Sequence, residues 1–197
     1  MKKDQDTTVE EAQPDINQRY TYSEYLEWDD DKRWELIDGV PFELSTPPVR
    51  HQEISGRLFV QLATFLKGKE CEVFFAPFDV RLNAEGRDDT VVQPDLVVIF
   101  DKTIMMETGC KGPPDIVIEI LSPSTSIRDK ALKLKLYQKS GVREYWIVDT
   151  DEKFVHAHIL DNSRYYINCY AETDEVPVSI LEGCKINLAE VFEESEV

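Results

Sequence analysis

Two hydrophobic stretches of this chain carry acidic side chains at positions where a buried strand would ordinarily hold none. Asp95 follows Pro94 at the start of one apolar run, and Glu119 lies inside another, residues 115–121. A buried carboxylate without compensation is costly, so Glu119 must be paired with a cation, protonated or bound to a metal. A structural ion pair and a metal or acid/base site both meet this requirement.

Asp95 by itself could be a turn residue that only caps the backbone. If the two strands are neighbours, however, Asp95 and Glu119 point to one site. Paired carboxylates are the ligands that hard ions such as Mg²⁺ or Mn²⁺ require. The pair therefore predicts a divalent-metal phosphodiesterase site.

The helix expected after the second strand supplies a cation. Asp129, Lys133 and Tyr137 are spaced i, i+4 and i+8, which keeps them within one stripe of roughly 80°. A surface Asp–Lys pair is one interpretation of this spacing. The stripe is flanked by apolar residues, which favours partial burial and would aim the ammonium group at the carboxylates: Ala131, Leu132, Leu134 and Leu136.

Three further polar residues are weaker candidates. Glu35 could be an exposed acid of an early strand, and His51 could be a helix cap or a surface residue. Ser122 could be the nucleophile of another hydrolase class, but it precedes a proline and no Gly-x-Ser-x-Gly elbow surrounds it. We expect Ser122 to cap the strand end or to hydrogen-bond a site acid.

The elements that must position these residues follow from hydrophobic periodicity and turn signals. A capping-box spacing predicts a short helix after Thr21, and Asp38-Gly39 predicts a hairpin. Longer helices are expected over residues 51–68 and 126–140, and residues 100–114 are expected to be a connection. Strands are expected at 34–37, 40–44, 73–75, 78–82, 91–100, 115–121, 144–148, 154–160 and 165–170.

The segment from Glu119 through the second long helix to Tyr145 has the length of a strand-helix-strand crossover. Such a crossover makes its two strands parallel neighbours. The order hairpin, helix, strands, helix, strands predicts an α/β fold with a central mixed sheet flanked by helices and with additional β-hairpins.

Length and composition bound the organisation of the chain. At 197 residues with 42% hydrophobic content it supports one well-buried domain. We expect a disordered polar tail at 1–18, a single domain at 19–192 and an acidic tail at 193–197. No run approaches the roughly 18 apolar residues of a membrane span, so we expect a soluble protein without membrane association. The four cysteines are scattered and indicate reduced thiols, so we expect a cytoplasmic protein.

The net charge of −17 opposes a protein that coats nucleic acid through a global positive field. Much of the excess lies in the ends, because residues 1–15 hold two Lys against five acids and residues 172–197 hold one Lys against eight. A bound metal ion would also make a carboxylate site attractive to phosphate.

Several segments together resemble the Uma-type restriction endonuclease family of the PD-(D/E)XK nuclease superfamily. The resemblance covers about residues 20–192. It is carried by WELIDG at 34–39, His51 with Leu58, PDL at 94–96, DIVIEILSPS at 115–124, Asp129 with Lys133 and Tyr137, and GVREYWIVD at 141–149.

The resemblance implies a restriction-endonuclease-like fold with an Mg²⁺ (or Mn²⁺) site that acts on nucleic acid, with DNA expected. Asp95 and Glu119 would be metal ligands, joined by the carbonyl of Ile120. The superfamily's general pattern has a catalytic lysine where this chain has Leu121, and Lys133 would take that role. Glu35 would help to hold metal or water.

Supporting roles would fall to His51, Ser122, Asp129 and Tyr137, with His51 orienting the site. The resemblance also implies a homodimer, and aromatic strand residues such as Tyr166 would supply an interface or belong to the core. A nuclease fold that binds without cleaving remains an alternative, favoured by the acidic charge and by Leu121.

Overall fold

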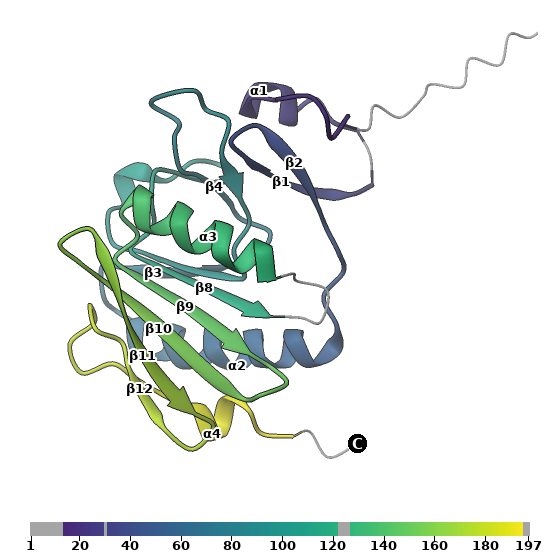
Figure 1. The fold of residues 1–197 in the computed structure, drawn as a ribbon. Coiled ribbons are helices and arrows are strands. Elements are labelled where there is room, and N and C mark those ends of the chain that lie inside the picture. The colour runs from purple at the N-terminus through teal and green to yellow at the C-terminus, as the bar shows by residue number, and fades with distance from the viewer. Residues whose placement is uncertain (1–13, 30, 122–126, 195–197) are drawn as a thin grey trace, which may run out of the picture.

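The computed structural model describes residues 14–29, 31–121 and 127–194, and only the backbone of 127–130 (Figure 1). Most of the predicted tail at 1–18, the end of the tail at 193–197 and Ser122 lie outside the described residues. The elements in chain order are α1 (Tyr22–Tyr25), β1 (Arg33–Ile37), β2 (Val40–Leu44), α2 (Val49–Leu66), β3 (Glu72–Phe75), β4 (Asp79–Arg81), β5 (Val91–Val92), β6 (Leu96–Ile99), a 3-10 helix (Lys102–Ile104), β7 (Gly109–Lys111), β8 (Ile116–Leu121), α3 (Ile127–Ser140), β9 (Glu144–Asp149), β10 (Phe154–Asp161), β11 (Arg164–Ala171), β12 (Glu175–Pro177), β13 (Lys185–Asn187) and α4 (Leu188–Val191).

A mixed six-stranded sheet forms the centre of the fold, in the order β11-β10-β9-β8-β6-β3. β8 and β9 are parallel, with Glu119 opposite Ile147, and α3 is the crossover between them. β6 runs antiparallel to β8 on its other side, with Leu96 opposite Ile118. The predicted α/β fold with a central mixed sheet and flanking helices is confirmed.

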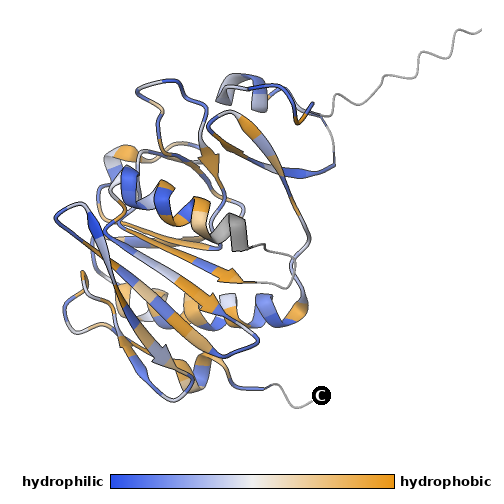
Figure 2. Ribbon diagram, in the orientation of Figure 1, coloured by the Kyte–Doolittle hydropathy of each residue, from blue (hydrophilic) through white to orange (hydrophobic). Residues whose placement is uncertain are grey.

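The two faces of β8 pack against different helices. Ile116, Ile118 and Ile120 belong to the core that includes α2, whereas Val117 and Leu121 belong to the core that includes α3. Because successive strand residues point to opposite faces, Glu119 shares the face of Val117 and Leu121 and is directed at α3. Figure 1 shows α2 and α3 on opposite sides of this sheet, and Figure 2 shows its strongly hydrophobic central strands.

A second, five-stranded sheet has the order β2-β1-β5-β4-β7 and carries the early acid. Along β1, Leu36 packs with Tyr22 of α1, whereas Ile37 packs in the core that includes Tyr137 of α3. Glu35 alternates with Leu36 and so shares the face of Ile37. The predicted hairpin of β1 and β2 therefore directs Glu35 at the same helix as Glu119.

The prediction that residues 100–114 form only a connection is wrong. This segment contains a 3-10 helix and β7, which pairs in parallel with β4. Glycine is common in such connections, but a Cβ atom at Gly109 would lie 1.9 Å from the backbone oxygen of Asp79. The glycine is required by close contact between two strands, and that contact is not local in sequence.

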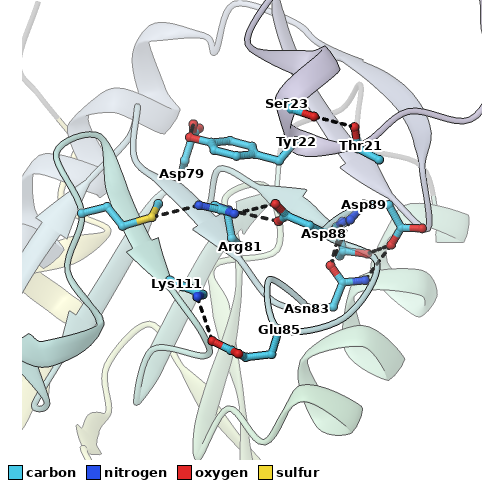
Figure 3. Close-up of polar contacts among 12 residues, drawn as sticks. Thr21, Tyr22, Ser23, Asp79, Arg81, Asn83, Glu85, Asp88, Asp89 and Lys111 are labelled. Atoms are coloured by element: carbon cyan, nitrogen blue, oxygen red, sulfur yellow. Dashed lines mark hydrogen bonds and ion pairs between the residues drawn. The ribbon is translucent and has the colours of Figure 1, made fainter.

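A polar cluster around Arg81 ties α1 to the second sheet (Figure 3). The Arg81 guanidinium lies 4.2 Å from the centroid of the Tyr22 ring, and its Nε donates to Asp88 Oδ1 at 3.1 Å. The Tyr22 hydroxyl in turn donates to Asp79 Oδ2 at 3.2 Å. Buried Asp79 is thereby held at the start of β4.

The four cysteines are free, as their scattered spacing predicts, and three of them are buried. In the part of the chain that the structure describes, the helices are too short or too polar for any to traverse a lipid bilayer.

Candidate active site

Lys133 lies between two acids that come from different sheets. Its Nζ is 2.9 Å from Glu35 Oε1 and 2.9 Å from Glu119 Oε1. Tyr137 lies one turn further along α3, and its hydroxyl donates to the same Glu119 oxygen at 2.7 Å. The spacing i, i+4 therefore brings Lys133 and Tyr137 together on Glu119, while the side chain of Asp129 lies outside the described residues.

Asp95 reaches the site from the start of β6. Because β6 pairs with β8, the backbone N–H of Ile120 donates to Asp95 Oδ2 at 2.7 Å. The ring Nε2 of His51, near the start of α2, lies 3.2 Å from the same oxygen. The Asp95 carboxylate is thus fixed one residue along β8 from Glu119, and His51 is buried behind it.

These groups open into one small pocket of about 90 Å³. The side chains of Asp95 and Glu119 are 19% and 14% exposed, so both carboxylates reach its surface. The lining residues relevant to chemistry are Arg33, His51, Gln93, Asp95, Glu119, Ile120 and Lys133.

The site holds more negative than positive charge, since the three acids Glu35, Asp95 and Glu119 outnumber the two cations Lys133 and Arg33. Burial, together with the charges of Asp95 and Glu35, raises the pKa of Glu119 to about 7, although the charge of Lys133 opposes this rise. Burial lowers the pKa of Lys133, but the charges of Glu119 and Glu35 outweigh it and keep the pKa above its ordinary value. Lys133 is therefore a permanent cation in a site that still attracts positive charge.

The donor atoms fit a hard divalent ion that keeps part of its water shell. Within residues 14–29, 31–121 and 127–194, no three His, Cys, Asp or Glu side chains are grouped to hold a metal by themselves. Mg²⁺ usually takes only one or two carboxylates and retains several waters. In the hydrogen bonds described above, Asp95 uses Oδ2 and Glu119 uses Oε1.

Sequence reasoning missed two residues of this pocket. The backbone N–H of Gln93 donates to Glu35 Oε1 at 2.8 Å, and the Gln93 side chain accepts from Arg33. A weak signal existed, because Gln93 directly precedes Pro94-Asp95 and Arg33 lies two positions before Glu35, on the same face of the strand. Neither position is distinctive without the fold.

Comparison with solved structures shows that this fold occurs in another protein. A crystal structure from Anabaena variabilis ATCC 29413, described as a putative nuclease belonging to DUF820, matches with a TM-score of 0.72. The match covers 88% of this chain and 97% of that chain at 21% identity, which shows a shared fold.

The family described as "Uma2: Putative restriction endonuclease" matches residues 22–189, and the chain belongs to this family. The uncharacterized protein slr1290 of Synechocystis sp. is 26% identical over 157 residues, which cover 78% of this chain and 81% of that protein. The predicted resemblance to Uma-type endonucleases is therefore confirmed.

Proposed function

We propose that this protein is a divalent-metal-dependent endonuclease that hydrolyses phosphodiester bonds of nucleic acid, with DNA as the substrate. One observation carries the proposal: the Lys133 ammonium is held by Glu35 and Glu119 at the wall of a pocket that Asp95 also lines. Carboxylates and cations that meet at one pocket suit a metal ion and a phosphate together.

Asp95 and Glu119 would hold Mg²⁺ or Mn²⁺, with the carbonyl of Ile120 as a further ligand. A bound ion of this kind polarises the phosphate and lowers the pKa of a coordinated water. The carboxylates supply oxygen ligands and charge, which is what these hard ions require.

The remaining side chains act by positioning. Lys133 orients the attacking water or offsets the negative charge that develops on the phosphate. Glu35, which is buried, holds Lys133 in place, and Tyr137 fixes one oxygen of Glu119 so that the other faces the ion. His51 restrains Asp95 in the same way.

The proposal is tested with purified full-length protein, Mg²⁺ or Mn²⁺, and four substrates: supercoiled, linear and single-stranded DNA, and RNA. We expect DNA cleavage that Asp95→Asn and Glu119→Gln each abolish. Asp161→Asn, a neutralisation at an exposed position at the end of β10, is the matched control and should cut like the parent. Failure of the parent to cut any substrate, or cleavage by both site variants, contradicts the proposal.

One observation favours a second function, a nuclease fold that binds nucleic acid without cleaving it. Lys133 already neutralises part of the acidic site, and no three ligand side chains converge in the described chain. Titration calorimetry separates the two functions. If the parent releases or absorbs heat on binding Mn²⁺ and Asp95→Asn does not, the result supports the endonuclease. If the parent binds no Mn²⁺ at millimolar concentration, the result supports the binding module.

We also propose that the protein acts as a homodimer through β11. This strand is the edge of the six-stranded sheet, and it exposes Tyr166 and Ile167 at 60% and 55%. Exposed apolar edge strands readily pair with another chain. Light scattering after size exclusion should give the mass of a dimer for the parent and of a monomer for Tyr166→Glu.

A further inference from the structure

Arg33, at the start of β1, stands where three pockets meet. It lines the pocket of about 90 Å³ that holds the acids, a pocket of about 460 Å³ beside α1 and a pocket of about 300 Å³ beside α2. Gln93 is shared by the first two of these pockets. A ligand in the α1-side pocket would therefore lie next to the acidic site, with Arg33 and Gln93 between them.

The Arg33 side chain is held in place by a neutral group. Its Nε and Nη2 donate to Gln93 Oε1 at 3.1 and 2.9 Å, and Gln93 Nε2 donates to Asp79 Oδ1 at 3.0 Å and to Tyr25 at 3.1 Å. Over the residues that the structure describes, no carboxylate forms an ion pair with Arg33. Its charge is thus oriented but not cancelled, which suits a phosphate.

The support beneath Gln93 is itself well ordered. Asp79 is 8% exposed and accepts from the Tyr22 hydroxyl, as Figure 3 shows at the tip of the Tyr22 ring. Both oxygens of the Asp79 carboxylate are therefore turned toward protein donors. Asp79 thus holds Gln93, and Gln93 holds the Arg33 guanidinium at the edge of the acidic pocket.

The α1-side pocket has aromatic walls. The Trp28 ring packs edge-on against Tyr25 at 5.3 Å and against Trp34 at 5.8 Å between centroids. Trp28 and Tyr25 are only partly buried, and Leu26 at the same pocket is 60% exposed. Partly exposed aromatic rings beside cations form the surface on which nucleic-acid bases stack.

We propose that the α1-side pocket binds one base of the substrate strand and that Arg33 binds the phosphate next to that base, which is the scissile phosphate. The identity of the ligand rests on the proposed function. The base would stack on Trp28 and Tyr25, so the strand must present at least one unpaired or extruded base beside the cleavage point. This assigns a subsite for a single nucleotide and makes Arg33 a positioning residue for the scissile phosphate.

Binding is measured by fluorescence anisotropy with the full chain carrying Glu119→Gln, so that the strand stays intact. The probes are a fluorescein-labelled thymidine oligonucleotide and an abasic sugar-phosphate oligomer of the same length, in Mg²⁺. Arg33→Gln should weaken binding of both probes about tenfold, as loss of a charge-assisted hydrogen bond does. Trp28→Ala should weaken only the base-carrying probe, by roughly tenfold.

Conservative and distant variants serve as controls. Trp28→Phe keeps an aromatic ring and should keep the preference for the base-carrying probe, which separates stacking from a folding defect. Lys139→Gln removes a charge at an exposed position in the last turn of α3, away from these pockets, and should leave binding of both probes unchanged.

Equal binding by the parent, Arg33→Gln and Trp28→Ala overturns the subsite but leaves the endonuclease proposal intact. Absence of binding by every protein to either probe also overturns the subsite. If the chain with Glu119 restored cuts no substrate, yet binding still depends on Trp28 and Arg33, the subsite stands and the endonuclease proposal fails. The two proposals are therefore tested separately.

Discussion

Lys133 Nζ lies 2.9 Å from Glu35 Oε1, although the two residues are 98 positions apart. Glu35 belongs to the five-stranded sheet, and Lys133 belongs to the crossover helix of the six-stranded sheet. The side chains are 3% and 14% exposed, so the ion pair is nearly buried. This contact joins the two sheets at the candidate site.

Replacing the lysine should therefore cost stability as well as activity. Lys133→Met leaves Glu35 and Glu119 without their shared cation, and breaking a buried ion pair typically costs about 3–5 kcal/mol. We expect a loss of that order in the free energy of unfolding, measured by urea denaturation, together with loss of nucleic-acid cleavage.

Lys135→Met is the matched control for this change. Lys135 lies on the same helix, but it is exposed and faces away from Glu119. It should unfold and cleave like the parent. Equal stability of Lys133→Met and Lys135→Met would show that the buried pair contributes nothing.

Removing the hydroxyl of Tyr137 should weaken metal binding and should lower the free energy of unfolding only modestly. Burial raises its pKa well above the ordinary value, so the hydroxyl stays protonated and donates to Glu119. Tyr137→Phe should cost about 1–2 kcal/mol of stability and weaken Mn²⁺ binding measured by calorimetry.

Tyr165→Phe tests whether that effect is local. The Tyr165 hydroxyl donates to the carbonyl of Val142 at 2.8 Å, away from the acids. This variant should lose similar stability and keep the parent's Mn²⁺ affinity. A loss of affinity in both variants would contradict a specific role for Tyr137.

Glu144 should make stability depend on pH. It is fully buried, its oxygens accept from the Trp146 indole at 2.7 Å and from the backbone of Ile180 at 3.3 Å, and burial raises its pKa to about 7. The folded state therefore keeps a proton that the unfolded chain, in which the glutamate has its ordinary pKa of 4.5, releases. Stability from this group is complete below pH 4.5 and is lost as pH rises toward 7, by about 3 kcal/mol.

The measurement is the urea midpoint at pH 5 and pH 8. Glu144→Gln cannot ionise, so its fall in stability between the two values should be smaller than the parent's. Glu182→Gln, at an exposed position, should keep the parent's full fall. If Glu144→Gln and the parent change alike, Glu144 does not carry this dependence.

Substitution of glycine by alanine should lower the stability of the protein at Gly109 and raise it at Gly56. A Cβ at Gly109 would lie 1.9 Å from a backbone oxygen, so Gly109→Ala must displace β7 from β4 and lower the thermal midpoint. Gly56 lies inside α2 with nothing within 4 Å of an added Cβ. Gly56→Ala should stabilise by about 0.5–1 kcal/mol, because glycine is a poor helix former. Destabilisation by both changes would contradict this difference.

Much of the central fold could be predicted from local pattern. The apolar run around Glu119, the helix after it and the strand after that have the length of a crossover, which gave the parallel pairing of β8 and β9. The helical period likewise predicted that Lys133 and Tyr137 share one face. Their convergence on Glu119 follows from that geometry, whereas their roles in catalysis stay predictions.

The rest depends on contacts that no local pattern encodes. β7 was missed because its pairing with β4 is distant in sequence and its glycine resembles a turn residue. Arg33 and Gln93 were missed because they are 60 positions apart and come together only when β1 and β5 are paired. β12, β13 and α4 are too short for periodicity to detect.

The acids of the site are divided between two sheets that come from distant parts of the chain. The segment from β8 through α3 to β9 contains Glu119 and Lys133, which are 14 positions apart, whereas Glu35 belongs to the N-terminal hairpin, 98 positions from Lys133. Proteins open in local units, each with its own free energy. A transient departure of the hairpin would thus free Lys133 from Glu35 while the central sheet remains folded.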